Sequence, residues 1–344
     1  MKAAIIGATG YSGLELVRLI QNHPFFSIGS LNTSSSPGTS INEGYPHLAN
    51  IEYILQDIQP EKIAKESDLV FLATPSGVSS QLTPIFMELG LKVIDLSGDL
   101  RLKDSDQYTR WYKKTPVSNH VLEEAVYGLT EWNKEQIAKA KILANPGCYP
   151  TATLLGLAPL LKEGWTDGED LIIDAKSGAS GAGRTAQTST LYSEINENMK
   201  IYKVHEHQHI PEIEQQIKSW LPGASSIDFS THLVPMTRGI MSTMYVKANQ
   251  DITTKQLIEL YQETYINCPF IRIGRETIFP CTKQVYGSNY CDIGIALNER
   301  TNRITIVSVI DNLLKGAAGQ AVQNANVMYG LSETEGLKHM PLFP

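Results

Sequence analysis

The sequence predicts an α/β protein, in which a doubly wound domain with a parallel sheet is joined to a second, α+β domain. Up to residue 146, short and nearly all-apolar strands alternate with helical patterns, which is typical of a parallel sheet covered on both faces. From residue 147 onward strands dominate and helices become fewer, as in a mixed sheet. A chain of 344 residues is also long for a single core.

The bulk composition is that of a soluble globular protein, with 42% hydrophobic and 19% charged residues. A formal net charge of -7 and the lack of a basic stripe argue against nucleic acid as a partner. No apolar run is long enough to span a membrane, and the chain begins with a strand rather than a signal peptide, so we expect a cytoplasmic protein without a membrane partner. The 4 cysteines show no CxxC spacing, which favours reduced thiols.

The first strand, residues 2–6, ends in glycines at Gly7, Gly10 and Gly13, and a helical pattern follows. Glycines between a strand and a helix let the backbone approach a pyrophosphate, whose charge then rests on the N–H groups at the helix start. The spacing is GxxGxxG rather than GxGxxG, and the alternative is a glycine-rich turn without a ligand. The strand-to-helix context favours a Rossmann-type nucleotide-binding domain.

The end of the second strand, residues 27–31, indicates which dinucleotide binds. An NAD-selective site places Asp or Glu here, against the adenosine ribose. Residues 32–38 instead carry neutral amide and hydroxyl groups, and no carboxylate that would repel a 2′-phosphate. The sequence therefore predicts NADP, with a merely polar loop as the alternative.

Two further strands, residues 68–73 and 93–96, are followed by loops 73–77 and 97–101, which we expect at the same carboxyl edge of the sheet as the glycine turn. Asp99 and Arg101 are interpreted as fixing a loop rather than taking part in chemistry. The expected cofactor contacts of this domain are Gly7, Thr9, Gly10, Tyr11, Ser12, Gly13, Ser34, Ser36, Ala73, Pro75 and Ser97.

Cys148 lies in a turn, Asn145–Thr151, between a buried strand at 142–144 and a helical pattern over 153–161. A helix start stabilises negative charge, and such positions lower a thiol pKa from its free value of about 8.5. Cys148 is therefore the candidate nucleophile, and backbone N–H groups of its turn could stabilise an oxyanion. The alternative is a small apolar residue buried in a turn.

The loop Ser177–Arg184 consists of small residues and ends in a cation. Backbone N–H groups and a guanidinium together can hold a phosphate or carboxylate, so the loop suits an anionic substrate. A flexible linker is the alternative.

Three histidines, His205, His207 and His209, alternate just before a helix expected from Pro211. One of them could act as the general base for Cys148, or all three could bind zinc. Same-face positions of a strand lie about 6.6–6.8 Å apart, which makes three-way chelation awkward and favours acid/base chemistry.

A helix of small residues over 312–328 is expected to return to the first domain. The predicted domains are therefore 1–146, completed by 312–344, and 147–311.

Five segments together resemble the N-acetyl-γ-glutamyl-phosphate reductases of arginine biosynthesis, and the resemblance covers essentially the whole chain. The segments are Gly7–Gly13, Asn145–Thr151, Ser177–Arg184, His207–Glu212 and Asp311–Gln320. The cysteine motif is the most specific of these. Aspartate-semialdehyde dehydrogenases are similar in domain plan and cysteine chemistry.

The resemblance implies NADPH-dependent reduction of N-acetyl-γ-glutamyl phosphate, a small-molecule acyl phosphate, to N-acetylglutamate semialdehyde through a cysteine thioester. It implies no metal, a homodimer or homotetramer, and a second domain that carries catalysis and dimerisation. Cys148 would be the nucleophile and His207 the acid/base. The family pattern is His-Arg-His, and Gln208 departs from it. Substrate contacts are expected from Ser177, Gly178, Arg184, His209 and Arg238, and further cofactor contacts from Gly181 and Asn312.

Three alternatives remain open at this stage. One is an aspartate-semialdehyde dehydrogenase-like reductase of another acyl phosphate, because Arg184 and Arg238 could each bind a carboxylate. The other two are a zinc-dependent hydrolase that uses the three histidines and a non-catalytic NADP-binding regulator.

Overall fold

The computed structural model describes residues 1–343 and separates into two compact units. The first unit consists of Met1–Pro146 and Ala317–Lys338. The second consists of Gly147–Gly316 and the residues from His339 onward. Within residues 1–343, no helix is both long and apolar enough to cross a membrane.

The C-terminal part of the chain is divided differently from the range 312–344 expected from sequence. Asn312 belongs to the second unit, where its side chain accepts a hydrogen bond from the Gly239 amide (2.7 Å). The chain end also belongs there, because the Leu342 amide donates to the carbonyl oxygen of Tyr286 (2.8 Å). The segment 317–338 is the part that completes the first unit.

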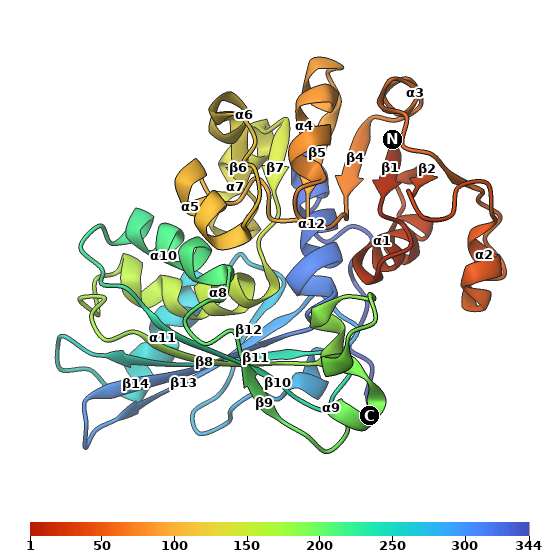
Figure 1. Ribbon diagram of the computed structural model, residues 1–344. Coiled ribbons are helices and arrows are strands. Elements are labelled where there is room, and N and C mark those ends of the chain that lie inside the picture. Colours follow the sequence, from red (N-terminus) through yellow and green to blue (C-terminus); the bar gives the residue numbers. More distant parts are fainter. Residues whose placement is uncertain (344) are drawn as a thin grey trace. The chain divides into compact units, whose positions relative to one another are not determined.

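The first unit holds one parallel sheet, drawn from red to yellow in Figure 1. Its strands are β1 (Lys2–Ile6), β2 (Ser27–Asn32), β3 (Leu55–Gln56), β4 (Leu69–Leu72), β5 (Lys92–Asp95), β6 (Ala125–Tyr127) and β7 (Ile142–Ala144). They form a seven-stranded sheet in the order β3-β2-β1-β4-β5-β7-β6. Strand order reverses between β1 and β4, and ligands of doubly wound sheets bind at such a point. The predicted doubly wound domain is confirmed.

Helices connect these strands. They are α1 (Tyr11–Gln21), α2 (Ile41–Gly44), α3 (Pro60–Glu66), α4 (Ser79–Glu88), α5 (Ser105–Tyr112), α6 (Asn119–Glu124), α7 (Thr130–Lys139) and the C-terminal α12 (Gly319–Met328). The whole of α12 is buried in this unit, and its Gln and Asn side chains all donate hydrogen bonds from their amide nitrogens. Asn324, for example, accepts from Thr130 Oγ1 (2.6 Å) and donates to the Gly128 carbonyl (2.8 Å). The expected helix 312–328 is interrupted, because Leu314–Ala318 form a π-helical turn before α12.

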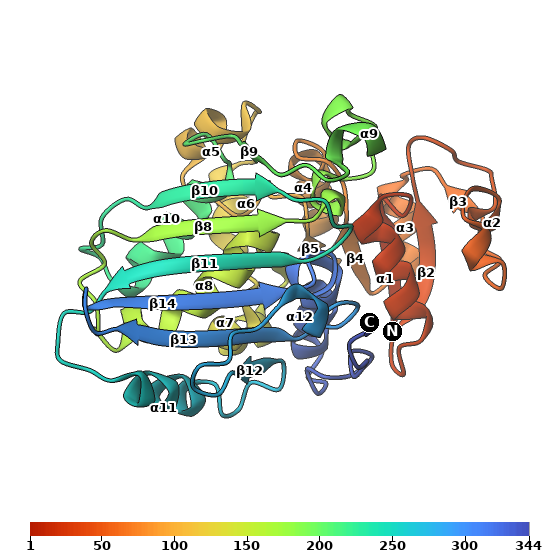
Figure 2. The same ribbon diagram turned by 90° about the horizontal axis from the view of Figure 1, so that it is seen from below.

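The second unit is built on a mixed sheet. Its strands are β8 (Ile172–Ser177), β9 (Lys200–Tyr202), β10 (Asp228–Leu233), β11 (Ile240–Lys247), β12 (Ile271–Ile273), β13 (Cys291–Asn298) and β14 (Arg303–Ile310). They form a seven-stranded sheet in the order β12-β13-β14-β11-β8-β10-β9. The helices are α8 (Cys148–Lys162), α9 (Tyr192–Ile195), α10 (His209–Trp220) and α11 (Thr254–Thr264). Helices α8, α10 and α11 lie on one face, and Figure 2 views the sheet from its other face. The α+β prediction is confirmed.

Helix α8 carries the cysteine motif at its start and a proline near its end. Pro159 has no N–H, so it cannot donate to the carbonyl oxygen of Leu155 four residues earlier. The Tyr265 hydroxyl donates to that oxygen instead (2.6 Å). This substitute hydrogen bond lets the helix continue through the proline to Lys162.

Candidate active site

Cys148 is the first residue of α8, and Gly147 is the N-cap, with φ -66° and ψ 156°. The Thr151 amide and hydroxyl both donate to the Gly147 carbonyl oxygen (2.9 Å each) and close the first turn. The sequence placed the helix start near residue 153, but Pro150 lies in the first turn, where proline is tolerated. Cys148 is partly exposed, whereas residues 149–161 are buried. The thiol therefore lies at the positive end of a helix dipole and can be reached from solvent.

The turn before Cys148 is held by a buried carboxylate. The Gly147 amide donates to Oε1 of Glu212 (2.8 Å), and Glu212, in the first turn of α10, is fully buried. The sequence analysis missed this residue, although an acidic residue in the first turn of a helix was a visible signal. Pro146 and Pro150 carry no N–H, so Cys148 and Tyr149 are the residues of the turn whose N–H groups could face an oxyanion.

His209 is the first residue of α10 and lies directly against the cysteine turn. A Cβ atom added to Gly147 would be 2.5 Å from His209 Nε2 and 2.9 Å from two ring carbons. The imidazole is therefore packed on the backbone of the residue that precedes Cys148. Glycine at 147 provides the space for this ring.

His207 occupies a different environment, an aromatic cage of Tyr149, Tyr202 and Phe229. The ring centroids lie 5.4, 5.7 and 5.7 Å from the imidazole, which is only 3% exposed. Burial, assisted by the charge of Lys203, lowers the pKa of His207 to about 3. Its Nδ1 accepts a hydrogen bond from the His209 amide (3.2 Å). His207 is therefore a neutral imidazole with its proton on Nε2 at physiological pH.

The three alternate histidines do not converge. The rings of His207 and His209 are 4.7 Å apart, but His205 is exposed, with a left-handed φ of 57°. Among residues 1–343, no group of three or more His, Cys, Asp or Glu side chains is placed to hold a metal ion. The geometry gives no support to the zinc hypothesis.

Two phenols, those of Tyr149 and Tyr202, lie between the histidine cage and Cys148. Tyr149 Oη lies 3.1 Å from Tyr202 Oη. Burial is the main reason that the pKa of Tyr202 rises to about 12 and that the pKa of Tyr149 also rises. Electrostatic interaction with Cys148 acts in the same direction on both groups. Both hydroxyls therefore stay protonated within the electrostatic field of the thiol.

The loop Ser177–Arg184 is fastened to its neighbour at 236–239 by its backbone. Gly178, Ala179 and Ser180 donate their amides to the carbonyls of Gly239, Met236 and Thr237 at 2.9, 2.8 and 3.0 Å. Ser177 is buried and its hydroxyl donates to the Gly178 carbonyl, whereas Arg184 is exposed. The expected nest of N–H groups is thus used inside the protein, and Arg184 is the group of this loop best suited to an anion.

Asn312 and Arg238 are also engaged within the second unit. The Asn312 amide donates to Ser180 Oγ (2.9 Å) and accepts from the Gly239 amide, and so it holds the two loops together beside Gly181. Arg238 Nη1 lies 3.6 Å from Oδ2 of Asp311, a fully buried carboxylate. These contacts give Asn312 and Arg238 a local structural role, in addition to the cofactor and substrate contacts expected from the sequence.

The glycine turn of the first unit has the geometry of a dinucleotide cradle. Gly7 has a φ of +84°, and a Cβ there would lie 2.3 Å from the Ala73 carbonyl oxygen. A Cβ on Gly13 would lie 2.2 Å from the Gly7 carbonyl oxygen, so α1 packs closely on the turn. Gly10 is the N-cap of α1, and Tyr11 and Ser12 open its first turn. The turn thus presents the start of α1 to a phosphate group.

The loop after β2 lies beside this turn. Thr33 Oγ1 is 3.4 Å from Thr9 Oγ1 and 3.0 Å from Ser35 Oγ, while Ser34 is exposed and Ser36 is half-buried. The structure therefore brings the expected ribose-binding hydroxyl groups to the edge that holds the glycine turn.

The loops after β4 and β5 meet at the same edge. Ser76 Oγ donates to the Ser97 carbonyl (3.1 Å), so the loops that carry Ala73, Pro75 and Ser97 touch. Asp99 accepts from the amides of residues 77 and 80 and from Tyr108 Oη (2.8 Å). The expectation that Asp99 fixes a loop is confirmed. Arg101 likewise donates to the carbonyl oxygens of residues 96 and 145.

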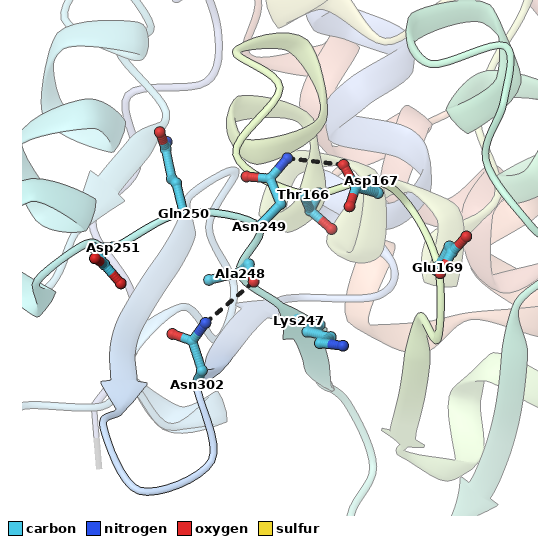
Figure 3. A pocket seen from close by; sticks show the side chains of 9 residues that line it. All are labelled: Thr166, Asp167, Glu169, Lys247, Ala248, Asn249, Gln250, Asp251 and Asn302. Atoms are coloured by element: carbon cyan, nitrogen blue, oxygen red, sulfur yellow. Dashed lines mark hydrogen bonds between the residues drawn. The ribbon is translucent and has the colours of Figure 1, made fainter.

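Two cavities of the second unit differ in their position relative to the candidate active site. The first, of about 330 Å³, lies in loops that follow the C-terminal end of α8, the end away from Cys148. Its polar side chains tie the loops together, as when Asn249 donates to Asp167 Oδ1 (2.9 Å) and Asn302 to the Ala248 carbonyl (3.2 Å) (Figure 3). The second, of about 260 Å³, is lined by His207 and is the one associated with the candidate active site.

Comparison with known proteins agrees with this architecture. Residues 2–140 match the family model of the semialdehyde dehydrogenase NAD binding domain, and residues 148–312 match the semialdehyde dehydrogenase dimerisation domain. Among solved structures, aspartate semialdehyde dehydrogenase II complexed with ASA from Vibrio cholerae has a TM-score of 0.73 at 19% identity and covers 96% of this chain and 98% of its own. Aspartate semialdehyde dehydrogenase with NADP from Candida albicans has a TM-score of 0.67 at 17% identity, with 95% and 98% covered. At such identities the likeness concerns the fold.

Fold and matched models define the class as a two-domain oxidoreductase of the semialdehyde dehydrogenase type. Curated relatives are far more similar. The N-acetyl-gamma-glutamyl-phosphate reductases of Geobacillus sp. (strain WCH70) and Bacillus cereus (strain B4264) are 57% and 56% identical, with 100% of both chains covered in each case. The chain belongs to the N-acetyl-gamma-glutamyl-phosphate reductase family, as the motifs predicted. It is an enzyme of amino-acid biosynthesis, which disfavours the hydrolase and the non-catalytic regulator.

Proposed function

We propose that the protein catalyses the NADPH-dependent reduction of N-acetyl-γ-glutamyl phosphate to N-acetylglutamate semialdehyde and phosphate, in the arginine pathway of the cytoplasm. The carrying observation is Cys148 at the first position of α8 with the His209 ring packed on Gly147. This arrangement pairs a nucleophile with an acid/base group. The substrate is proposed from the names of the relatives.

Cys148 acts first in this proposal. Its thiolate, favoured by the start of α8, attacks the acyl carbon, and phosphate leaves with the electron pair of the broken C–O bond. A thioester remains on Cys148. When bound, NADPH supplies the hydride that reduces this thioester. The thiohemiacetal on Cys148 then collapses, so that the C–S bond breaks, the aldehyde leaves and the thiolate is restored. The N–H groups of Cys148 and Tyr149 are proposed to stabilise the oxyanion.

A histidine must supply and remove the proton on the reacting oxygen. The sequence assigned this role to His207, but two observations favour His209. His209 lies against the cysteine turn, whereas the pKa of His207 of about 3 leaves that ring neutral near pH 7. A group that shuttles protons works best with a pKa near the working pH. We propose that His209 is the acid/base and that His207 orients it by accepting the His209 amide proton.

Replacing each histidine by Asn tests this division. His209→Asn should lower kcat by about 10²–10⁴-fold and remove a titration from the pH profile, the usual contribution of a positioned proton-transfer group. His207→Asn should change kcat less and leave the titration in place. If His207→Asn lowered kcat and removed the titration while His209→Asn left both unchanged, His207 would be the acid/base, as the sequence predicted.

The first unit is proposed to bind NADP rather than NAD. Its glycine turn leaves room for a pyrophosphate, and Thr33, Ser34 and Ser36 offer hydroxyl groups where an NAD-selective site has a carboxylate. The solved Candida albicans structure that shares this fold is described as containing NADP, which is compatible with this choice.

A homodimer or homotetramer is proposed as the working form. The match to a dimerisation domain covers the second unit, whose sheet carries helices α8, α10 and α11 on one face. The other face exposes cross-strand pairs such as Ile172 with Tyr245, which are 38% and 36% exposed. Such a face suits the same face of a second copy.

The decisive experiment is the reverse reaction, in which NADP reduction is followed with N-acetylglutamate semialdehyde and inorganic phosphate. We expect phosphate-dependent NADPH formation with this aldehyde and little with aspartate semialdehyde. The opposite preference would assign the enzyme to the aspartyl branch of the superfamily. No phosphate-dependent reduction with either aldehyde would refute the proposed function.

A further inference from the structure

We propose that the cavity beside His207 is an anion subsite whose charge comes from Lys203, assisted by Lys200, and that it holds a phosphate or carboxylate of the substrate. The proposal rests on the proposed function, because it takes the acyl-phosphate substrate as given. It assigns a specificity-determining role to two lysines outside the motifs that identified the site.

The cavity has a volume of about 260 Å³, enough for an anionic group, and is lined only by residues of the second unit. Lys200 and Lys203 both line it, and the described lining residues include no Asp or Glu. Two cations without a lining carboxylate give the cavity a positive potential. A bound phosphate or carboxylate would be the natural counter-ion.

Lys203 is held in position by its surroundings. Its Nζ donates to Gln208 Oε1 (2.7 Å), so the ammonium group and the amide occupy the same part of the cavity wall. Its backbone has a left-handed φ of 47°, which is uncommon for a non-glycine residue and is found at functional sites. Partial burial lowers the pKa of Lys203, and a bound anion would reverse that shift.

The cavity also adjoins the reacting centre. Tyr202 and His207 line it, and the Tyr202 hydroxyl is 3.1 Å from that of Tyr149, the residue after Cys148. Gly181 and Ala182 of the loop that ends in Arg184 form another part of the wall. In this proposal, a substrate whose acyl carbon is at Cys148 places one of its anionic groups in this cavity.

Gln208 is the neutral neighbour of Lys203 in the cavity wall, because its amide oxygen accepts the hydrogen bond from Lys203 Nζ. Because Lys203 Nζ contacts the end of the Gln208 side chain, it supplies positive charge where an arginine at 208 would have placed it. A positive charge placed at residue 208 instead of residue 203 should therefore preserve the subsite.

Lys203→Met in the full-length enzyme tests the proposal, with the reverse reaction as the assay. A hydrogen bond to a charged group contributes about 1.5–3 kcal/mol, so one KM should rise by about 10- to 100-fold while kcat changes little. A rise in the KM for inorganic phosphate would identify the phosphate as the bound group, and a rise in the KM for the semialdehyde its carboxylate. Lys203→Met/Gln208→Arg should recover most of the lost affinity. Lys218→Met, at an exposed lysine in the last turn of α10, is the matched control.

Lys203→Arg, which keeps the charge, separates loss of charge from loss of fold and should stay near the wild-type KM values. Both KM values within about twofold of wild type in a folded Lys203→Met enzyme would overturn the subsite, since such a change is far below the expected effect. The subsite would also be overturned if Lys203→Met raised a KM and the same KM stayed raised in both Lys203→Arg and Lys203→Met/Gln208→Arg. A wild-type enzyme that reduces NADP with neither aldehyde would refute the proposed function instead. In that case protection of Cys148 from alkylation by inorganic phosphate, lost in Lys203→Met, would still support the subsite, and its absence in wild type would overturn it.

Discussion

Gly147→Ala should separate the nucleophile from its acid/base partner. The backbone of Gly147 (φ -66°, ψ 156°) is open to any residue, so alanine brings no backbone strain. The new methyl group would lie 2.5 Å from His209 Nε2, about 0.9 Å short of the 3.4 Å at which ordinary contact begins. Since Gly147 is hydrogen-bonded to Glu212, we expect the His209 ring to move by nearly that distance. A misplacement of about 1 Å can lower a rate by about 10²-fold.

Steady-state kinetics of the reverse reaction provide the assay, with kcat expected to fall by about 100-fold. Alkylation of Cys148 by iodoacetamide should be affected much less, because α8 and its dipole remain. Gly223→Ala is the control, since a Cβ there meets no atom within 4 Å. A Gly147→Ala enzyme within about threefold of wild type would show that the position of the His209 ring does not limit the rate.

Four other predictions concern single groups. Cys148→Ser should nearly abolish turnover and leave NADPH binding unchanged, because a serine alkoxide is far less accessible than a thiolate; a rate within about tenfold of wild type would remove Cys148 as nucleophile. Ser34→Asp should lower kcat/KM for NADP relative to NAD by placing a charge near the 2′-phosphate, and an unchanged ratio would contradict the proposed ribose site. Tyr265→Phe should lower the free energy of unfolding by about 1–3 kcal/mol, because the Leu155 carbonyl loses its donor; urea denaturation measures this. The pKa of His207 is about 3 in the folded protein and 6.5 ordinarily. Between pH 6.5 and pH 3 the imidazole therefore binds a proton in the unfolded chain but not in the folded protein, so the free energy of unfolding falls as the pH drops through this range. His207→Gln should flatten this acid limb, which has a slope of up to about 1.4 kcal/mol per pH unit, and an unaltered limb would speak against the buried neutral imidazole.

Much of the fold could be predicted because local patterns were unambiguous. The first strand Lys2–Ile6 and the short strand Ile142–Ala144 have the predicted bounds, since each is an apolar run that ends at turn residues. Helix starts were less certain. Both α8 and α10 begin before the predicted position, because Pro150 and Pro211 lie inside the first helical turn rather than at its boundary.

The candidate site could be predicted only where its residues are close in sequence. Cys148 and the histidine motif are visible in short segments, and so is the glycine turn. The bond from Gly147 to Glu212 joins residues 65 positions apart, and no local pattern indicates it. The cage around His207 likewise depends on Phe229 in a distant strand, so the large effect of burial on the pKa of His207 could not be inferred from the sequence.

In the proposed mechanism, Glu212 reconciles opposing electrostatic demands at this site. The start of α8 favours a thiolate at Cys148, but His209 opens α10, where the same kind of field disfavours an imidazolium. The Glu212 carboxylate lies three residues after His209 and accepts from Gly147, and so brings negative charge to the first turn of α10 and to the residue before the nucleophile. That charge compensates the dipole field at His209. It also opposes the thiolate, but the Cys148 and Tyr149 N–H groups remain on the nucleophile's own helix to offset the repulsion. We therefore propose that one buried carboxylate allows two adjacent helix starts, those of α8 and α10, to hold groups of opposite charge during the reaction.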